Sequence, residues 1–111
     1  MKRGDVVIVY FPFSDRTGSK RRPALVVQAD ALNRALRETI LASISTTARG
    51  EATHVLLDLT SDPKSGLNVA CGIRCEKLLV VDRRFIRGPI GQLTEQTMRK
   101  VDEGLKRALS L

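Results

Sequence analysis

Arg74 and Glu76 stand two residues apart in the stretch CGIRCEKL, residues 71–78, which alternates as a β-strand does. Side chains two apart in a strand lie on the same face, so this guanidinium and this carboxylate can flank a single group. A carboxylate can take up a proton, and a guanidinium can stabilise the negative charge that develops on a phosphate. The alternative is an ordinary surface ion pair, worth about 0–1 kcal/mol.

Basic residues also gather in SKRRP, residues 19–23, where Lys20, Arg21 and Arg22 meet the start of an expected strand. Pro23 restricts Arg22 to extended backbone, which limits the directions of its side chain. Arginine can bind phosphate through two parallel hydrogen bonds, so the run is a candidate phosphate site. A solvated basic loop is the alternative.

Small hydroxyl side chains close the expected strand TILASISTT, residues 39–47, and Ser45 and Thr46 are among them. Such residues commonly form turns, but they also donate hydrogen bonds to phosphate oxygens. The single histidine, His54, heads another apolar run, and we interpret it as structural because no second histidine is near it.

The composition favours a nucleic-acid partner. The chain has 111 residues, which suits one domain over residues 1–111, and its formal charge is +7. Arginine supplies 13 of the 19 basic residues, and a basic surface rich in arginine attracts polyanions. A basic domain without such a partner is the alternative.

The cysteines argue against a disulfide and against zinc. In an extended strand the Cα atoms of Cys71 and Cys75 would be roughly 13 Å apart, too far for a disulfide bond. One histidine and two cysteines make a zinc site improbable, so we expect no metal. Free thiols, no signal peptide and no transmembrane run indicate the cytoplasm.

The elements that must position these residues are short strands followed by one helix. Apolar runs predict strands over residues 5–12, 23–28, 39–47, 53–59 and 67–81, the last broken near Glu76–Lys77. Asp30 is expected to cap a short helix, residues 82–91 read as irregular, and Thr94 begins an amphipathic helix that runs to the end. This predicts a small, strongly bent antiparallel sheet or barrel with a terminal helix. The first strand is apolar on both faces, which suggests a two-fold interface.

Taken together, RGDVVIVYFPF, GSKRRPALVV, ISTT, GIRCEKL and VDEGLKRALSL resemble, in this order, the MazF/PemK family of type II toxins. The resemblance implies a mainly β (α+β) fold, an SH3-like barrel similar to that of CcdB with a short helix and a C-terminal helix, assembled as a homodimer. It implies a sequence-specific endoribonuclease that needs no metal or other cofactor. Single-stranded RNA would be cut by its 2′-hydroxyl, leaving a cyclic phosphate and a 5′-hydroxyl. The implied protein partner is an acidic antitoxin.

Carried onto this chain, the family's site residues are Arg22, Arg74, Glu76 and Thr46. Glu76 would remove the proton of the 2′-hydroxyl, Arg74 would stabilise the phosphorane, and Arg22 would clamp a non-bridging oxygen. Further contacts to RNA are expected from Ser45, Lys20, Arg21, Ser19 and Lys77.

Two departures, together with the reliance of other members on the arginine and threonine pair instead, bear on which residue is the base. Glu76 stands where members with an RCD motif have the shorter aspartate, and the first loop, SDRTGSK, lacks the histidine that some members use. Two other functions share the fold: a CcdB-like toxin that binds gyrase, and a family member that binds RNA without cutting it.

Overall fold

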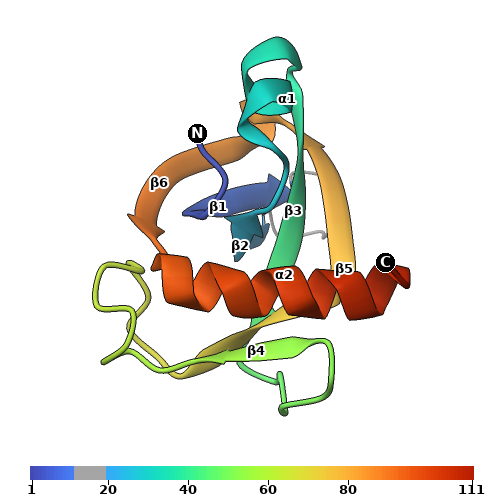
Figure 1. The fold of residues 1–111 in the computed structure, drawn as a ribbon. Helices are drawn as coiled ribbons and strands as arrows, with labels where there is room; N and C mark the ends of the chain where they lie inside the picture. The colour runs from blue at the N-terminus through green and yellow to red at the C-terminus, as the bar shows by residue number, and fades with distance from the viewer. Residues whose placement is uncertain (12–19) are drawn as a thin grey trace.

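The computed structural model describes residues 1–11 and 20–111, so Ser19, a predicted RNA contact, lies outside the described residues. Six strands, two α-helices and a 3-10 turn make up the described part (Figure 1). In chain order these are β1 (Asp5–Phe11), β2 (Lys20–Val26), α1 (Asp30–Ala35), β3 (Glu38–Ser45), β4 (His54–Leu57), β5 (Cys71–Asp82), η1 (Arg83–Phe85), β6 (Ile86–Gln92) and α2 (Glu95–Leu109).

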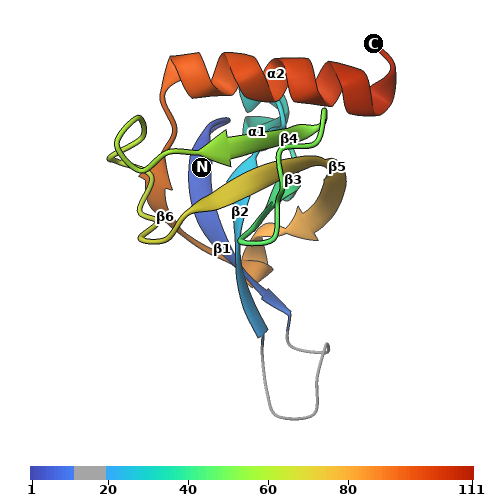
Figure 2. The same ribbon diagram turned by 90° about the horizontal axis from the view of Figure 1, so that it is seen from below.

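The strands form one antiparallel sheet in the order β4-β5-β3-β2-β1-β6. The sheet is strongly bent, and α2 lies across one of its faces (Figures 1 and 2). This confirms the predicted fold class of a small bent sheet with a terminal helix. In the pairing of the described residues β4 and β6 remain the two edges, so the sheet is open where the resemblance implied a barrel.

Apolar side chains fill both faces of the sheet. Val6, Leu25 and Ile73 belong to a large cluster that packs against Val101 of α2. Val7, Val9, Ala24, Val26 and Leu41 form a second cluster on the opposite face. One chain therefore already buries Val6, Val7 and Val9 to 1% exposure or less. Ile8 and Tyr10 of the same strand stay partly exposed, so the two-fold interface that its apolar faces suggested remains a prediction.

A bulge interrupts β5 where the sequence predicted a break. Ala42 of β3 pairs with Leu78, but the next residue, Ser43, pairs with Arg74, so residues 75–77 are looped out of this ladder. The strand nevertheless continues from Cys71 to Asp82. Because the bulge changes which face later residues occupy, Lys77 can line the same cavity as Arg74.

Three local expectations were wrong. Residues 82–91, expected to be irregular, contain most of β6, which pairs with β1. The second strand, expected to begin at Pro23, begins at Lys20. Asp30 is the first residue of α1 and not its cap; its Oδ1 accepts a hydrogen bond from the backbone N–H of Arg3 at 2.7 Å.

Two other expectations are confirmed. The side chain of Thr94 caps α2 by accepting a hydrogen bond from Thr97 N–H, and both cysteines are free and buried. Within residues 1–11 and 20–111, no helix is both long and apolar enough to cross a membrane.

Candidate functional site

A groove of about 470 Å³ opens on the sheet face opposite α2, beside the second apolar cluster. Its walls come from β1, β2, β3, β5 and the turn after β3. The charged side chains of this lining are the three cations Arg22, Arg74 and Lys77. The full lining is Val9, Arg22, Pro23, Ala24, Ser43, Ile44, Ser45, Thr47, Arg74, Lys77 and Leu79. A concave surface with converging cations suits an anion such as phosphate.

Strand register places the two arginines on this face. Val9, which is buried in the second cluster, pairs with Arg22 across β1 and β2. Ser43 pairs with Ala24 on one side and with Arg74 on the other. Because directly paired residues in adjacent strands point to the same side, Arg22 and Arg74 share a face two strands apart.

Hydroxyl groups stand at the end of β3, where they were expected. The Oγ of Ser45 lies 2.8 Å from Thr47 Oγ1 and also accepts a hydrogen bond from Thr47 N–H. Ser45 and Thr47 line the groove, whereas Thr46, the predicted family threonine, is exposed in the turn and is absent from the lining. The sequence therefore located the hydroxyl cluster but not which threonine faces the cavity.

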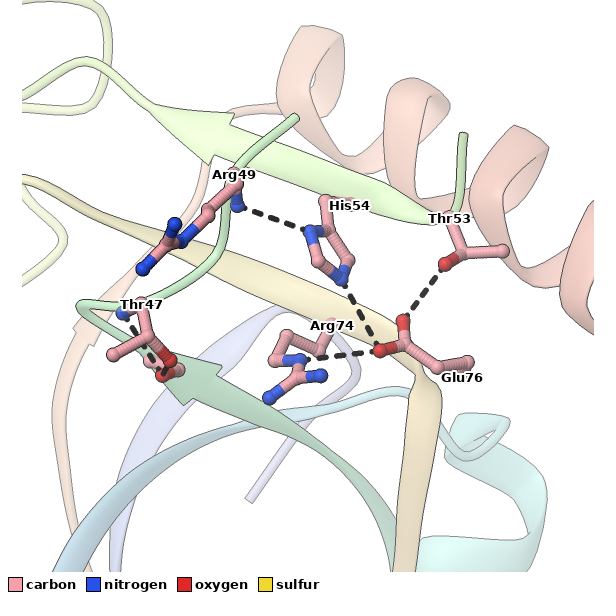
Figure 3. Close-up of polar contacts among 7 residues, drawn as sticks. Thr47, Arg49, Thr53, His54, Arg74 and Glu76 are labelled. Atoms are coloured by element: carbon pink, nitrogen blue, oxygen red, sulfur yellow. Dashed lines mark hydrogen bonds and ion pairs between the residues drawn. The ribbon is translucent and has the colours of Figure 1, made fainter. Parts of the chain in front are cut away.

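Glu76 is not part of the groove lining, and its carboxylate lies among Thr53, His54 and Arg74 (Figure 3). Its Oε2 accepts from Arg74 Nε and lies 3.1 Å from His54 Nε2, while Oε1 accepts from Thr53 Oγ1 at 2.8 Å. Burial by itself would raise the pKa of Glu76, but the bonds from Thr53, its own backbone N–H, His54 and Arg74 outweigh burial and lower that pKa to about 2. The predicted Arg74–Glu76 pair is real, and it is part of a larger network.

His54 is the participant that sequence reasoning missed. Its side chain is 6% exposed, and its Nδ1 accepts a hydrogen bond from the backbone N–H of Arg49 at 3.2 Å. His54 pairs with Arg74 across β4 and β5, which brings the imidazole to the carboxylate two residues further on. Only this strand register, which apolar periodicity does not reveal, would have identified it.

The predicted residues thus divide into separate groups. Arg22, Arg74, Ser45 and Lys77 meet at the groove, with Glu76 and Thr46 outside its lining. Arg21 lies on the opposite sheet face from Arg22, with its guanidinium 5.4 Å from the Tyr10 ring centroid. For Lys20 the structure describes the backbone, which pairs with Phe11.

The donor set within the described ranges does not suit a metal. No three His, Cys, Asp or Glu side chains there are grouped as metal ligands would be. The two cysteines are poor metal ligands, because a metal binds the thiolate and burial raises the pKa of both thiols, that of Cys75 to about 11. Cys75 Sγ also contacts the Val101 carbonyl oxygen.

Fold and groove together define a small basic α+β protein with an arginine-lined groove. The family model described as PemK-like, MazF-like toxin of type II toxin-antitoxin system matches residues 2–109, and the chain belongs to this family.

Characterised relatives agree with this assignment. The chain is 32% identical over 106 residues to the endoribonuclease MazF6 of Mycobacterium tuberculosis, covering 90% of this chain and 88% of the relative. It is 33% identical over 117 residues to the endoribonuclease EndoA of Bacillus subtilis, covering 100% and 96%.

Solved structures agree in fold. A mycobacterial endoribonuclease in complex with its cognate antitoxin matches with a TM-score of 0.83 and 23% identity, covering 100% of this chain and 96% of that one. A MazE–MazF complex from Deinococcus radiodurans matches with a TM-score of 0.79 and 19% identity, covering 100% and 97%.

Proposed function

We propose that this toxin is a metal-independent, sequence-specific endoribonuclease that holds single-stranded RNA in the groove beside Arg22 and Arg74. The observation that carries the proposal is that these two guanidinium groups line one cavity together with the hydroxyls of Ser45 and Thr47. Family membership and relatives named endoribonucleases support it.

In the proposed reaction the 2′-hydroxyl oxygen attacks the adjacent phosphorus and the bond from phosphorus to the 5′-oxygen breaks. The products are a 2′,3′-cyclic phosphate and a 5′-hydroxyl, so the proton lost by the 2′-oxygen is balanced by one gained at the 5′-oxygen. Arg22 clamps a non-bridging oxygen, and Arg74 stabilises the negative charge of the phosphorane. Ser45 and Thr47 add hydrogen bonds, and Lys77 attracts a neighbouring phosphate.

Glu76 takes a different part in this proposal from the one the family resemblance implied. A carboxylate with a pKa of about 2 is a weak proton acceptor near neutral pH, and Glu76 is outside the groove lining. Its bond to Arg74 Nε instead holds the guanidinium in place. We therefore assign Glu76 to orienting Arg74.

The proposal extends to partners and location. Structures of similar fold contain an antitoxin, and a groove lined by Arg22, Arg74 and Lys77 would accept an acidic antitoxin segment that imitates the charge of RNA. We also propose that the toxin works as a homodimer, as the family resemblance implies, and that it acts in the cytoplasm. The buried cysteines, both reduced, are consistent with that compartment.

The decisive experiment incubates tag-free protein with a long mixed-sequence RNA in EDTA and maps the new ends. We expect cleavage at recurring short motifs with 5′-hydroxyl ends. Arg22→Ala should lose affinity and turnover together, because a phosphate clamp serves both ground and transition states. Arg99→Ala, on exposed α2 surface away from the groove, is the matched control.

Two results would contradict the proposal. Cleavage that stops in EDTA and returns with magnesium would overturn the metal-independent mechanism. Bound but intact RNA would show a binding protein, and intact RNA together with inhibited gyrase would favour the CcdB-like function.

A further inference from the structure

We infer that His54 is a positioning residue that ties together two walls of the groove, one carrying Arg74 and the other carrying the hydroxyls after β3. The inference rests on the proposed function, because it concerns how the RNA site is held in shape. The imidazole itself lines a separate hollow between β4 and α2 and is not part of the groove lining, so a direct contact with RNA is not invoked.

The contacts of the imidazole determine which nitrogen carries the proton. Nδ1 faces the Arg49 backbone N–H, which is a donor, so Nδ1 must accept. Nε2 faces Glu76 Oε2, which is ionised because the pKa of this carboxyl is about 2, so Nε2 must donate. The geometry therefore requires a neutral ring protonated at Nε2, with both nitrogens satisfied at 6% side-chain exposure.

The Nε2 contact acts on Arg74. Oε2 of Glu76 accepts from His54 Nε2 and from Arg74 Nε, each at 3.1 Å, so one oxygen links the imidazole to the guanidinium. Arg74 Nε is thereby occupied, and the outer nitrogens of the guanidinium are left for an anion in the groove (Figure 3). If His54 is removed, the carboxylate keeps the Thr53 bond at Oε1, but its Oε2 is then held by Arg74 alone, so the guanidinium loses a fixed partner.

The Nδ1 contact acts on the opposite wall. Arg49 belongs to the connection from β3 to β4, the same segment that carries Thr46 and Thr47. That connection runs close over β5, since a Cβ added at Gly72 would come within 2.7 Å of Ala48 Cβ. The bond from Arg49 N–H to His54 anchors the segment just beyond this close approach and so limits where the Thr47 hydroxyl can lie.

The alternative to a positioning role is that His54 is a buried histidine that merely satisfies its own hydrogen bonds. Two isosteric variants distinguish these two roles. The Oδ1 of asparagine reaches the place of Nδ1, so His54→Asn keeps the anchor to Arg49 and loses the link to Glu76. The Nε2 of glutamine reaches the place of Nε2, so His54→Gln keeps the link and loses the anchor.

The proposal predicts opposite kinetic defects in these variants. His54→Asn should cleave bound RNA roughly 10- to 100-fold more slowly with nearly unchanged Kd, the range for losing a group that orients a functional side chain. His54→Gln should keep the rate of the bound complex and bind RNA more weakly. Melting temperatures of both, measured in parallel, identify loss of folding. Equal rates and Kd values in both variants and the unmodified protein, or the same defect in both, would overturn the proposal.

A measurement without RNA separates this inference from the proposed function. The chain has one histidine, so the imidazole nitrogen signals of tag-free, ¹⁵N-labelled protein belong to His54. At about pH 8 we expect protonated Nε2 and bare Nδ1, and an ordered Arg74 Nε–H signal that broadens in His54→Asn but not in His54→Gln. A proton on Nδ1, or an Arg74 signal unaffected by either variant, would overturn the positioning role. Failure of the unmodified protein to cleave RNA would count against the proposed function alone.

Discussion

At the scale of single residues, Glu76 accepts hydrogen bonds on both carboxylate oxygens, and this decides how a glutamine should behave there. The amide oxygen of glutamine can take the place of Oε2 and accept from Arg74 and His54. Its NH₂ group would face Thr53 Oγ1, which can accept instead of donate. Glu76→Gln therefore preserves the arrangement that orients Arg74, whereas Glu76→Ala removes it.

We accordingly predict that Glu76→Gln lowers single-turnover cleavage by less than about tenfold, and that Glu76→Ala lowers it by more. A general base would behave otherwise, since its loss typically costs about 10²–10⁴-fold in rate and glutamine cannot replace it. Glu103→Gln, which neutralises an exposed carboxylate on α2, is the control. Equally inactive Gln and Ala variants, both still folded, would restore Glu76 as the base.

The Arg74–Glu76 pair could be predicted from the sequence because two residues on one strand need only local alternation to share a face. The partners contributed by Thr53 and His54 could not, because they depend on how β4 is placed against β5. Thr46 was expected from the family resemblance; that Thr47 lines the groove instead depends on the turn after β3, whose geometry the apolar pattern does not encode.

At the scale of elements, the bulge in β5 has the largest effect on the site. Alternation placed Glu76 on the same face as Arg74, but the looped-out residues 75–77 bring Lys77 to the groove and leave Glu76 outside its lining. Strand β6 was not predicted, because it too depends on pairing with another strand. Gly88, Pro89 and Gly91 weaken its intrinsic strand propensity, and it forms because β1 offers a free edge to pair with.

Helix α2 is seated on the sheet through Gly104, which is buried against β5. A Cβ at this position would lie 2.7 Å from Cys75 Sγ and 3.4 Å from the Thr53 carbonyl oxygen. Cys75 is fully buried, so its sulfur has little room to move. Gly104→Ala should therefore destabilise the protein by about 1–3 kcal/mol through overpacking, despite a helix-propensity gain of about 1 kcal/mol.

Urea unfolding of Gly104→Ala, Cys75→Ala and the double variant tests this contact. The alanine at position 104 should cost clearly less when Cys75 is already alanine, which is the coupling expected of residues in contact. Additive effects, or a stabilised Gly104→Ala protein, would mean that the helix does not meet the sheet at this point. Because Cys75 lies between Arg74 and Glu76, cleavage should fall along with stability.

At the scale of the whole molecule, the two faces of the sheet differ in what covers them and in their charge. α2 covers the larger apolar cluster, and the opposite face combines the smaller cluster with the cationic groove. A net charge of +7 alone predicts general attraction to RNA, with no preferred location. On the proposed function, the close phosphate contacts come from Arg22, Arg74 and Lys77, which line the groove, and basic residues on α2 serve as controls.

The salt dependence of binding distinguishes a groove from a uniformly basic surface. For single strands, the logarithm of the association constant falls with the logarithm of salt concentration with a slope of about −0.7 per neutralised phosphate, so three contacts give about −2. We predict this slope for a pool of 2′-O-methyl RNA oligonucleotides, which cannot be cleaved. Lys77→Gln should make it shallower by about 0.7, while Lys100→Gln, on α2, should leave it unchanged. Equal slopes for the two variants would show that RNA is attracted by overall charge and does not occupy the groove.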